Sequence, residues 1–234
     1  MAQSGFRTLG APILAVALLP ALCFAQDKPD LSSPKAAART FGDAVIAGDV
    51  AKAKAVSVGN EKQGTILEAM VNLVGGMKKL EDAMIAKYGK EAFKSGKSPV
   101  SSEEMQDAVK RLGEGEVKVT GDTAVITPKK KEGADPGHNE PWTLKKVGSE
   151  WKVDLGSLTK SLEQSGAADE QVEGMKAFHT MIGGMTTEVA AGKYKTLGEA
   201  NEAVKQAFER MGAELAAKRQ KAGAQPGAPA KQGN

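Results

Sequence analysis

The segment Glu116–Leu155 constrains the fold more than any other part of the chain, because its apolar residues recur at every second position. Val117 and Val119 alternate with charged residues, a spacing that places both valines on one face of a β-strand. Gly121-Asp122 and Gly148-Ser149 have the composition of two-residue hairpin turns. The segment therefore predicts two successive β-hairpins, whose four strands form an antiparallel sheet with one apolar face.

Helical patterns precede the predicted sheet. Ser33-Pro34 combines an N-cap hydroxyl with a first-turn proline, and Gly48 ends the helix that starts there. A short second helix is predicted for Asp49–Val56, and a long third one for Gln63–Tyr88. Gly75-Gly76 lies inside the third helix, where glycine is unfavourable. This pair indicates either a kink or a second backbone packed closely against the helix.

Further helices flank the sheet on its C-terminal side and just before it. Ser101–Glu104 has the sequence of a capping box and predicts a helix through Leu112. Apolar residues recur at helical spacing over Met175–Val189, and a second capping box at Thr196–Glu199 opens the last helix. Gly183-Gly184 resembles the first glycine pair and suggests another close helix crossing. Two helices joined by a short turn form a helical hairpin.

The start of the chain has the pattern of an export signal. The apolar run Ala11–Leu22 is too short to cross a bilayer and precedes a small-residue cleavage site ending at Ala25. A lipid anchor on Cys23 is the alternative, disfavoured because the residue before Cys23 is not small. Cys23 is the only cysteine, so the mature chain has no disulfide and no cysteine-ligated metal. We expect an exported protein, periplasmic or secreted.

The chain divides into four predicted parts. Residues 1–25 form the signal peptide, 26–160 an α+β domain, 161–221 a C-terminal helical hairpin and 222–234 a disordered tail rich in Gly, Pro, Ala and Gln. No segment after the signal is long and apolar enough to span a membrane. Charges are interspersed and the formal net charge is only +3, which argues against a nucleic-acid partner.

The apolar face of the predicted sheet carries no catalytic group. Strand alternation points the following residues inward: Val117, Val119, Trp142, Leu144, Trp151, Val153 and Leu155. No Asp, Glu or His shares their phase, as general acid–base catalysis would require. Lys146 shares it, near a strand end where its amine reaches water. We therefore predict a ligand-binding surface formed by Trp142, Leu144, Lys146 and Trp151, with no catalytic residue and no cofactor.

Metal and nucleophile chemistry are poorly supported. The chain has two histidines, His138 and His179, which are not paired at helical spacing. His138 lies between Asp135 and Glu140 in a polar loop, but zinc needs three or four convergent ligands. A solvated loop is the preferred interpretation, and we predict no metal site. Neither a Gly-x-Ser-x-Gly elbow nor a glycine-rich phosphate loop is present in the sequence.

The order of these features resembles the superfamily named for nuclear transport factor 2, in particular its exported SnoaL-like domains. The resemblance covers about Ser33–Leu155 and depends mainly on the hairpin Gly148–Asp154 and on the helix break at Gly48-Asp49. It implies a cone of curved sheet wrapped by helices, a frame that hosts isomerases, dehydratases, cyclases and non-catalytic binding domains. The family's early strand between the second and third helices is not predicted here, and its catalytic Asp, His and Tyr positions have no counterparts.

Three classes of function follow from the sequence. The leading one is an exported, non-catalytic binding or interaction protein, whose partner is a small apolar ligand or an envelope protein. The second is a SnoaL-like enzyme of the isomerase or dehydratase type, which needs an inward acid such as Asp43, Glu68 or Glu81. The third is an envelope assembly protein whose C-terminal helices pair between chains as a coiled coil, although an intramolecular hairpin is the preferred interpretation.

Overall fold

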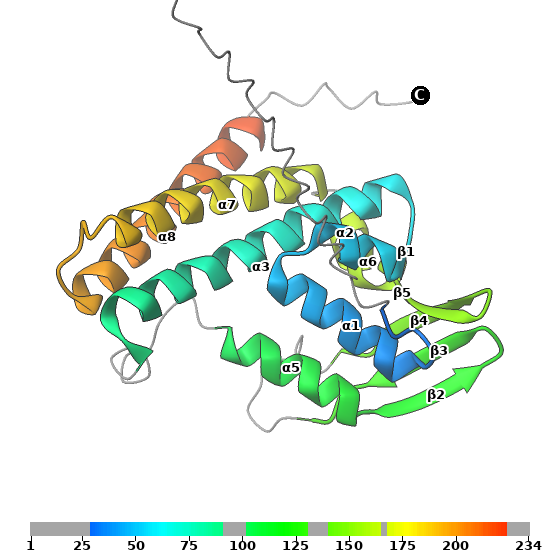
Figure 1. Cartoon of the computed structure of the whole chain (residues 1–234). Helices are drawn as coiled ribbons and strands as arrows, with labels where there is room; N and C mark the ends of the chain where they lie inside the picture. The colour runs from blue at the N-terminus through cyan, green and yellow to red at the C-terminus, as the bar shows by residue number, and fades with distance from the viewer. Residues whose placement is uncertain (1–28, 91–101, 131–139, 165–167, 224–234) are drawn as a thin grey trace, which may run out of the picture.

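The computed structural model describes residues 29–90, 102–130, 140–164 and 168–223. These residues form an α+β fold, with a sheet at one end and a layer of three long helices at the other (Figure 1). The predicted signal peptide and residues 224–234 lie outside the described part. In chain order the described elements are α1 (Pro34–Ala47), α2 (Val50–Ala55), β1 (Ser57–Val58), α3 (Glu61–Tyr88), α5 (Glu103–Glu114), β2 (Glu116–Thr120), β3 (Thr123–Thr127), β4 (Trp142–Val147), β5 (Glu150–Asp154), α6 (Leu155–Gln164), α7 (Ala168–Ala190) and α8 (Leu197–Gly223).

The sheet is mixed, which corrects the prediction of an antiparallel four-stranded sheet. Strands β2 to β5 form the two predicted hairpins, with their turns at Gly121 and Gly148, both of which have positive φ. The described sheet has a fifth strand, β1, which pairs in parallel with β5 and gives the order β1-β5-β4-β3-β2. The sequence did not predict this strand. It has only two residues, too few to produce an alternating pattern.

Helix α1 covers the inner face of the sheet and fills the space over it. Phe41 is 1% exposed and meets Trp142 edge to face, with ring centroids 5.6 Å apart. The sheet residues beneath α1 are buried, and they include Ala124, Ile126, Leu144 and Val153. The first core of the protein therefore lies between α1 and the sheet.

One residue predicted to face inward, Val119, is exposed. Val119 lies in the same cross-strand row as Ala124 and Leu144, yet its side chain is 54% exposed. β2 is an edge strand of the described sheet, and the end that carries Val119 extends beyond the helices (Figure 1). The phase was predicted correctly, and the burial of this residue was not. Leu155 is buried as expected, but it begins α6 rather than ending a strand.

The first glycine pair marks a close contact between two backbones. α3 is one uninterrupted helix, and a Cβ atom on Gly75 would lie only 2.4 Å from the Cα atom of Gly48. Gly48 ends α1 with φ +70° and donates its backbone N–H to the last turn of that helix. The second pair is different, because Gly183 and Gly184 are exposed and a Cβ on either would meet nothing within 4 Å. The predicted close crossing at the second pair is therefore wrong.

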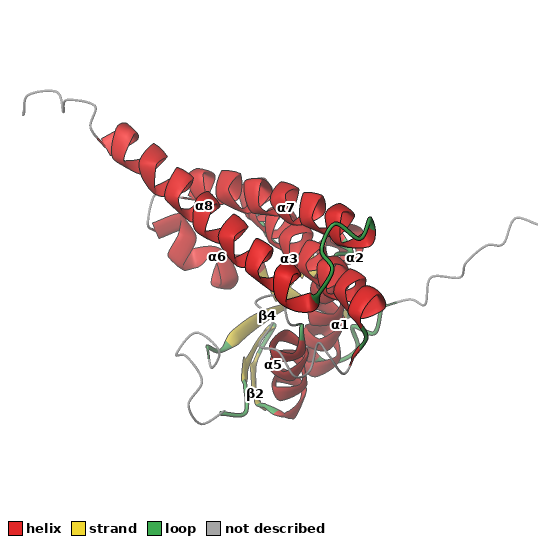
Figure 2. Ribbon diagram, turned by 90° about the vertical axis from the view of Figure 1, so that its left-hand side faces the viewer, coloured by secondary structure: helices red, strands yellow, loops and turns green. Residues whose placement is uncertain are grey.

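The C-terminal helices build a second core on α3. α7 lies along α3, and α8 folds back over them in the predicted hairpin (Figure 2). The buried residues of this core are Leu80, Met84, Ile182, Met185, Val189, Ala200, Val204 and Ala207. α3 contributes to both cores, so the predicted sheet part and hairpin part share one helix. α8 continues to Gly223, slightly past the predicted end of the hairpin.

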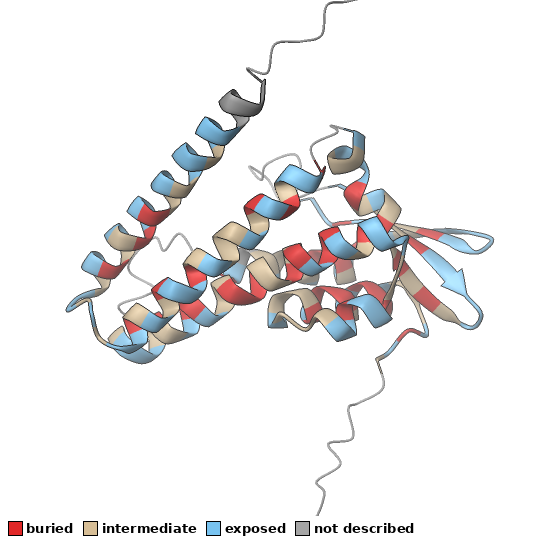
Figure 3. Cartoon of the chain, turned by 90° about the horizontal axis from the view of Figure 1, so that it is seen from above, coloured by how far each residue is buried: buried red, intermediate tan, exposed pale blue. Residues whose placement is uncertain are grey.

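The end of α8 leaves the body of the protein. Among the described side chains of α8, Ala207 is the last that is buried, and the end of the helix extends away from its neighbours (Figure 3). After Ala207, the half-buried residues among the side chains described as far as Lys218 are Phe208, Met211 and Leu215. None of the described helices has both the length and the apolar character needed to cross a bilayer.

Tyr88 and Tyr194 connect the end of α3 to the helical hairpin formed by α7 and α8. The hydroxyl of Tyr88 donates a hydrogen bond to the backbone oxygen of Tyr194 at 3.1 Å. The Tyr194 hydroxyl in turn donates to Glu188 at 2.5 Å, and Lys193 pairs with the same carboxylate at 2.6 Å. These are the only two tyrosines of the chain. Burial, followed by the hydrogen bond to Glu188, raises the pKa of Tyr194 to about 12.

We expect this raised pKa to make the fold sensitive to alkali. A tyrosine of the unfolded chain titrates near pH 10, so the folded state holds its proton more tightly. The contribution of Tyr194 to stability is therefore complete below about pH 10 and is lost as pH rises towards about 12. Tyrosinate absorbance of the Tyr88→Phe variant, which has one tyrosine left, measures this directly. A midpoint near pH 10 in protein that circular dichroism shows to be folded would contradict the structure.

Candidate functional site

The four predicted binding residues lie on one face of the β4–β5 hairpin, in different surroundings. Leu144 and Trp151 are buried, and Trp142 is half-buried against Phe41 of α1. Lys146 is exposed, and its Nζ atom lies 6.0 Å from the centre of the Trp151 ring. The chain itself therefore packs most of this apolar face. The accessible part is the Lys146 end of the hairpin, and ligand binding there stays a prediction.

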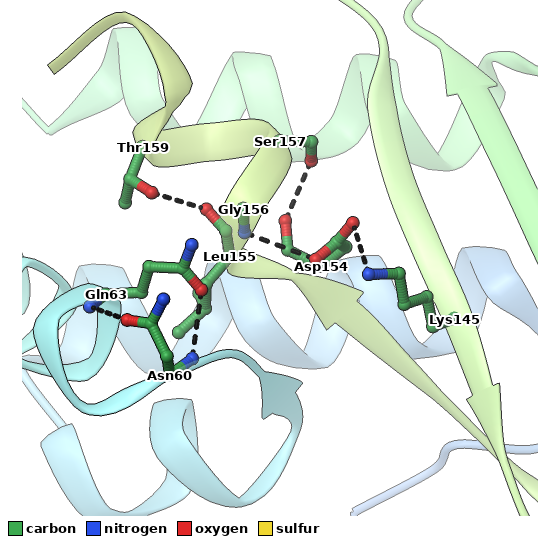
Figure 4. A network of polar contacts seen from close by, with 8 residues as sticks. All are labelled: Asn60, Gln63, Lys145, Asp154, Leu155, Gly156, Ser157 and Thr159. Atoms are coloured by element: carbon green, nitrogen blue, oxygen red, sulfur yellow. Dashed lines mark hydrogen bonds and ion pairs between the residues drawn. The ribbon is translucent and has the colours of Figure 1, made fainter. Parts of the chain in front are cut away.

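The polar end of the same hairpin has a structural role (Figure 4). One carboxylate oxygen of Asp154 accepts a hydrogen bond from the backbone N–H of Gly156 at 3.2 Å, and the other lies 3.1 Å from Lys145 Nζ. The backbone oxygen of Asp154 accepts a hydrogen bond from the Ser157 hydroxyl at 2.8 Å. The carboxylate thus satisfies one of the free N–H groups at the start of α6, that of Gly156. It points away from the apolar face, as its strand phase predicted.

The start of α3 lies beside this junction. Asn60 and Gln63 form a capping box, in which each side chain accepts a hydrogen bond from the other residue's backbone N–H at 3.0 Å (Figure 4). Gln63 is buried, and a Cβ atom on Gly59 would lie 2.9 Å from the Cβ of Leu155. The starts of α3 and α6 are therefore packed against each other, and this end of the sheet is closed by structural contacts.

The three acids considered for catalysis have other partners. Asp43 and Glu68 are exposed, and each forms a salt bridge with a neighbouring basic side chain. The hydrogen bond from its lysine partner lowers the pKa of Glu68. Glu81 is buried, and its carboxylate accepts the backbone N–H of Ser102 at 3.0 Å, directly before α5. Asp43 and Glu68 therefore serve in ion pairs, and Glu81 caps the backbone just before α5.

The residues weighed as metal ligands in the sequence lie partly outside the described structure. Asp135 and His138 lie outside the described residues. His179 is half-buried on α7 and borders a polar pocket of about 140 Å³ between α3 and α7, together with Glu68, Asn72 and Lys176. Among the described residues, no group of three or more His, Cys, Asp or Glu side chains is placed to hold a metal ion.

An open groove of about 870 Å³ lies on the outer side of α1, along the contact of α1 with α5. Its apolar floor includes Ile46, Ala47 and Val109. Its charged rim consists of Arg39, Asp43, Lys78, Lys110 and Glu114. A smaller space of about 450 Å³ continues it towards the start of α1 and shares Arg39, Asp43 and Gly113 with it. The two spaces form one surface feature, which we call the α1–α5 groove.

The sequence of α1 explains how the groove forms. At 100° per residue, Asp43 and Ile46 lie on the side of α1 opposite Phe41, so they face away from the sheet. Gly42 lets α5 come close, because a Cβ atom there would lie 2.4 Å from a methyl group of Val109. The two helices lie side by side in both views of the fold (Figures 1 and 2). An apolar residue out of phase with the core, such as Ile46, was the available sequence signal.

Comparison of the chain with models of known protein families, with curated protein sequences and with solved structures finds no match.

Proposed function

We propose that the chain is an exported, non-catalytic binding protein that engages its partner through the α1–α5 groove. The observation that carries the proposal is the contrast between two apolar surfaces. The inner sheet face is filled by α1, with Phe41 1% exposed, whereas Ile46 and Val109 remain half-buried on the floor of an open groove. Concave surfaces with an apolar floor and a few polar groups are the usual form of binding sites.

We also propose that the protein is exported and that its α+β part has a specific known architecture. The pattern of the first 25 residues supports export, and the lack of cysteine after Cys23 fits a domain stabilised by burial alone. We also propose that the α+β part is a cone of the nuclear transport factor 2 type. The position of β1 between α2 and α3 supports this, because it is where that family has its early strand.

Native mass spectrometry of the protein purified from the exported fraction of its own host tests the proposal. We expect an additional mass of protein or peptide size that is lost on denaturation. Ile46→Asp, which places a charge on the groove floor, should abolish that mass. Val119→Asp is the matched control, because Val119 is exposed at the far edge of the sheet and should not matter. Equal retention in both variants would refute the groove as the binding surface.

A small apolar ligand on the sheet face is the second candidate. The exposed Lys146 above the Trp151 ring favours it, because this pair leaves one end of the hairpin accessible. The only two tryptophans of the chain, Trp142 and Trp151, both lie on this face, so their fluorescence reports on it alone. An extra mass of small-molecule size whose release shifts tryptophan emission would select this candidate over the groove.

Assembly through the C-terminal helices is supported by the second half of α8, where none of the side chains described after Ala207 is buried. A chain that ends after Leu215 keeps that residue, whose Cδ1 atom would lie 3.6 Å from a Cβ atom on Gly174, and removes the projecting end of α8. If α8 pairs between chains, this truncation converts an oligomer into a monomer in light scattering. An unchanged mass would remove the assembly role.

A further inference from the structure

The α1–α5 groove has the shape left by a missing third helix. α1 and α5 run antiparallel, because the floor near Ile46 is bordered by Gln106 early in α5, whereas the end near Lys35 is bordered by Gly113 late in α5. Two antiparallel helices in contact leave a straight furrow between them, into which the side chains of a third helix pack. From Lys35 to Ala47 the furrow is about 18 Å long, the length of a helix of about 12 residues.

The floor of the groove matches one apolar helix face. Ile46 and Val109 are half-buried and belong to neither hydrophobic core among the described residues. Gly42 brings the two helices together at Val109, so the floor is continuous across the contact rather than split by a gap. An amphipathic helix presents apolar residues at i, i+3, i+4 and i+7, a stripe wide enough to cover this floor.

The charges along the groove are not balanced. Two of its carboxylates are paired with basic side chains, since Asp43 lies 3.8 Å from Arg39 and Glu114 lies 3.4 Å from Lys129, whereas Asp30 accepts hydrogen bonds only from neutral Ser32 and keeps its charge. Lys35 and Lys110 are exposed, and neither forms an ion pair with any residue that the structure describes. Two lysines without an ion pair outnumber the one such carboxylate, Asp30 near Lys35, so the free charge of the groove is positive on balance and is strongest at Lys110.

We infer that the α1–α5 groove binds an acidic amphipathic helix of a partner protein, an inference that rests on the proposed function. The apolar stripe of that helix covers Ile46 and Val109, and its flanking carboxylates meet Lys35 and Lys110. The binding mode is an amphipathic helix laid into a groove. Charge complementarity at the rim selects the partner and sets its direction, whereas the apolar floor supplies most of the affinity.

A pair of model peptides tests this inference on the full mature chain. Both have about 14 residues with leucine at the i, i+3, i+4 and i+7 positions, and they carry either glutamate or lysine at the flanking positions. Fluorescence anisotropy at low salt should show the acidic peptide binding about tenfold more tightly than the basic one. The double variant Lys35→Glu/Lys110→Glu should reverse that preference. Lys118→Glu, which changes an exposed lysine on β2, is the control and should leave it intact.

The outcomes separate the inference from the proposed function. Failure of both peptides to bind, equal binding of both, or a preference that survives the double reversal would overturn the inference. If the reversed variant does not fold by circular dichroism, Lys35→Gln/Lys110→Gln replaces it and should abolish the preference. A native partner that is lost with Ile46→Asp but carries a basic or non-helical binding segment would refute this inference while leaving the proposed groove function in place.

Discussion

Replacing Gly75 by alanine is expected to destabilise the protein by about 2–3 kcal/mol, although alanine is the better helix former. The added methyl group would lie 2.4 Å from the Cα atom of Gly48. Both atoms belong to the backbone or are fixed to it, so no flexible side chain can move aside. α1 and α3 must separate, and the packing on both sides of the contact weakens with them.

The same substitution at Gly183 is the matched control. Gly183 also lies inside a long helix and is also followed by glycine, but a Cβ atom there would meet nothing within 4 Å. Gly183→Ala should therefore stabilise the protein by up to about 1 kcal/mol through helix propensity alone. Urea unfolding of the two variants measures both values. Similar effects at the two positions would show that the α1–α3 contact is not as close as described.

Phe41→Ala is expected to have the largest effect of any single substitution proposed here, a loss of about 3–5 kcal/mol. Phe41 is 1% exposed at the centre of the first core and contacts Trp142 edge to face. Removing the ring leaves a cavity between α1 and the sheet that neither element can close without losing other contacts. Because α1 also forms one wall of the groove, we expect partner binding to weaken in this variant as well.

Phe208→Ala provides the comparison, because Phe208 also belongs to an aromatic pair. Its ring lies 5.4 Å from that of Phe178, but both side chains are only half-buried. The expected loss is below about 2 kcal/mol, since less apolar surface is returned to water. Urea unfolding gives both values, and tryptophan emission of Phe41→Ala should shift to the red as Trp142 becomes hydrated. A smaller loss for Phe41→Ala than for Phe208→Ala would contradict the assignment of the main core.

Local signals predicted the parts of this fold that depend on neighbouring residues. The hairpin turns at Gly121 and Gly148 were predicted because their positive φ needs glycine and the flanking strands alternate. The limits of α1 were predicted from Ser33, which accepts a hydrogen bond from the backbone N–H of Ala36, and from Gly48. In each case a few adjacent residues contain the whole signal.

Features that depend on distant contacts were not predictable in the same way. β1 has two residues and exists because β5 pairs with it, and Val119 is exposed because none of the described helices covers that end of β2. The two glycine pairs have nearly the same local sequence, yet only Gly75 faces another backbone. Sequence alone gives the phase of a residue along its helix or strand, whereas the tertiary arrangement decides what faces it.

The candidate site was also predictable only where it depends on local sequence. The sequence placed Trp142, Leu144, Lys146 and Trp151 on one face, and the structure has them there. It could not show that α1 fills most of this face. The α1–α5 groove depends on a contact between Gly42 and Val109, which lie far apart in the sequence, so no local pattern predicted it.

Lysine labelling in the native exported fraction would test the central claim most directly, because it does not require the partner to be known. Exposed lysines are modified in that fraction and again after purification, and peptide mass spectrometry compares the two. The proposed groove predicts that Lys35 and Lys110 are protected in the native fraction and become reactive on purification. Lys118, equally exposed but on β2, should react fully in both. Equal reactivity of all three lysines before and after purification would contradict the proposal that the α1–α5 groove is the binding surface.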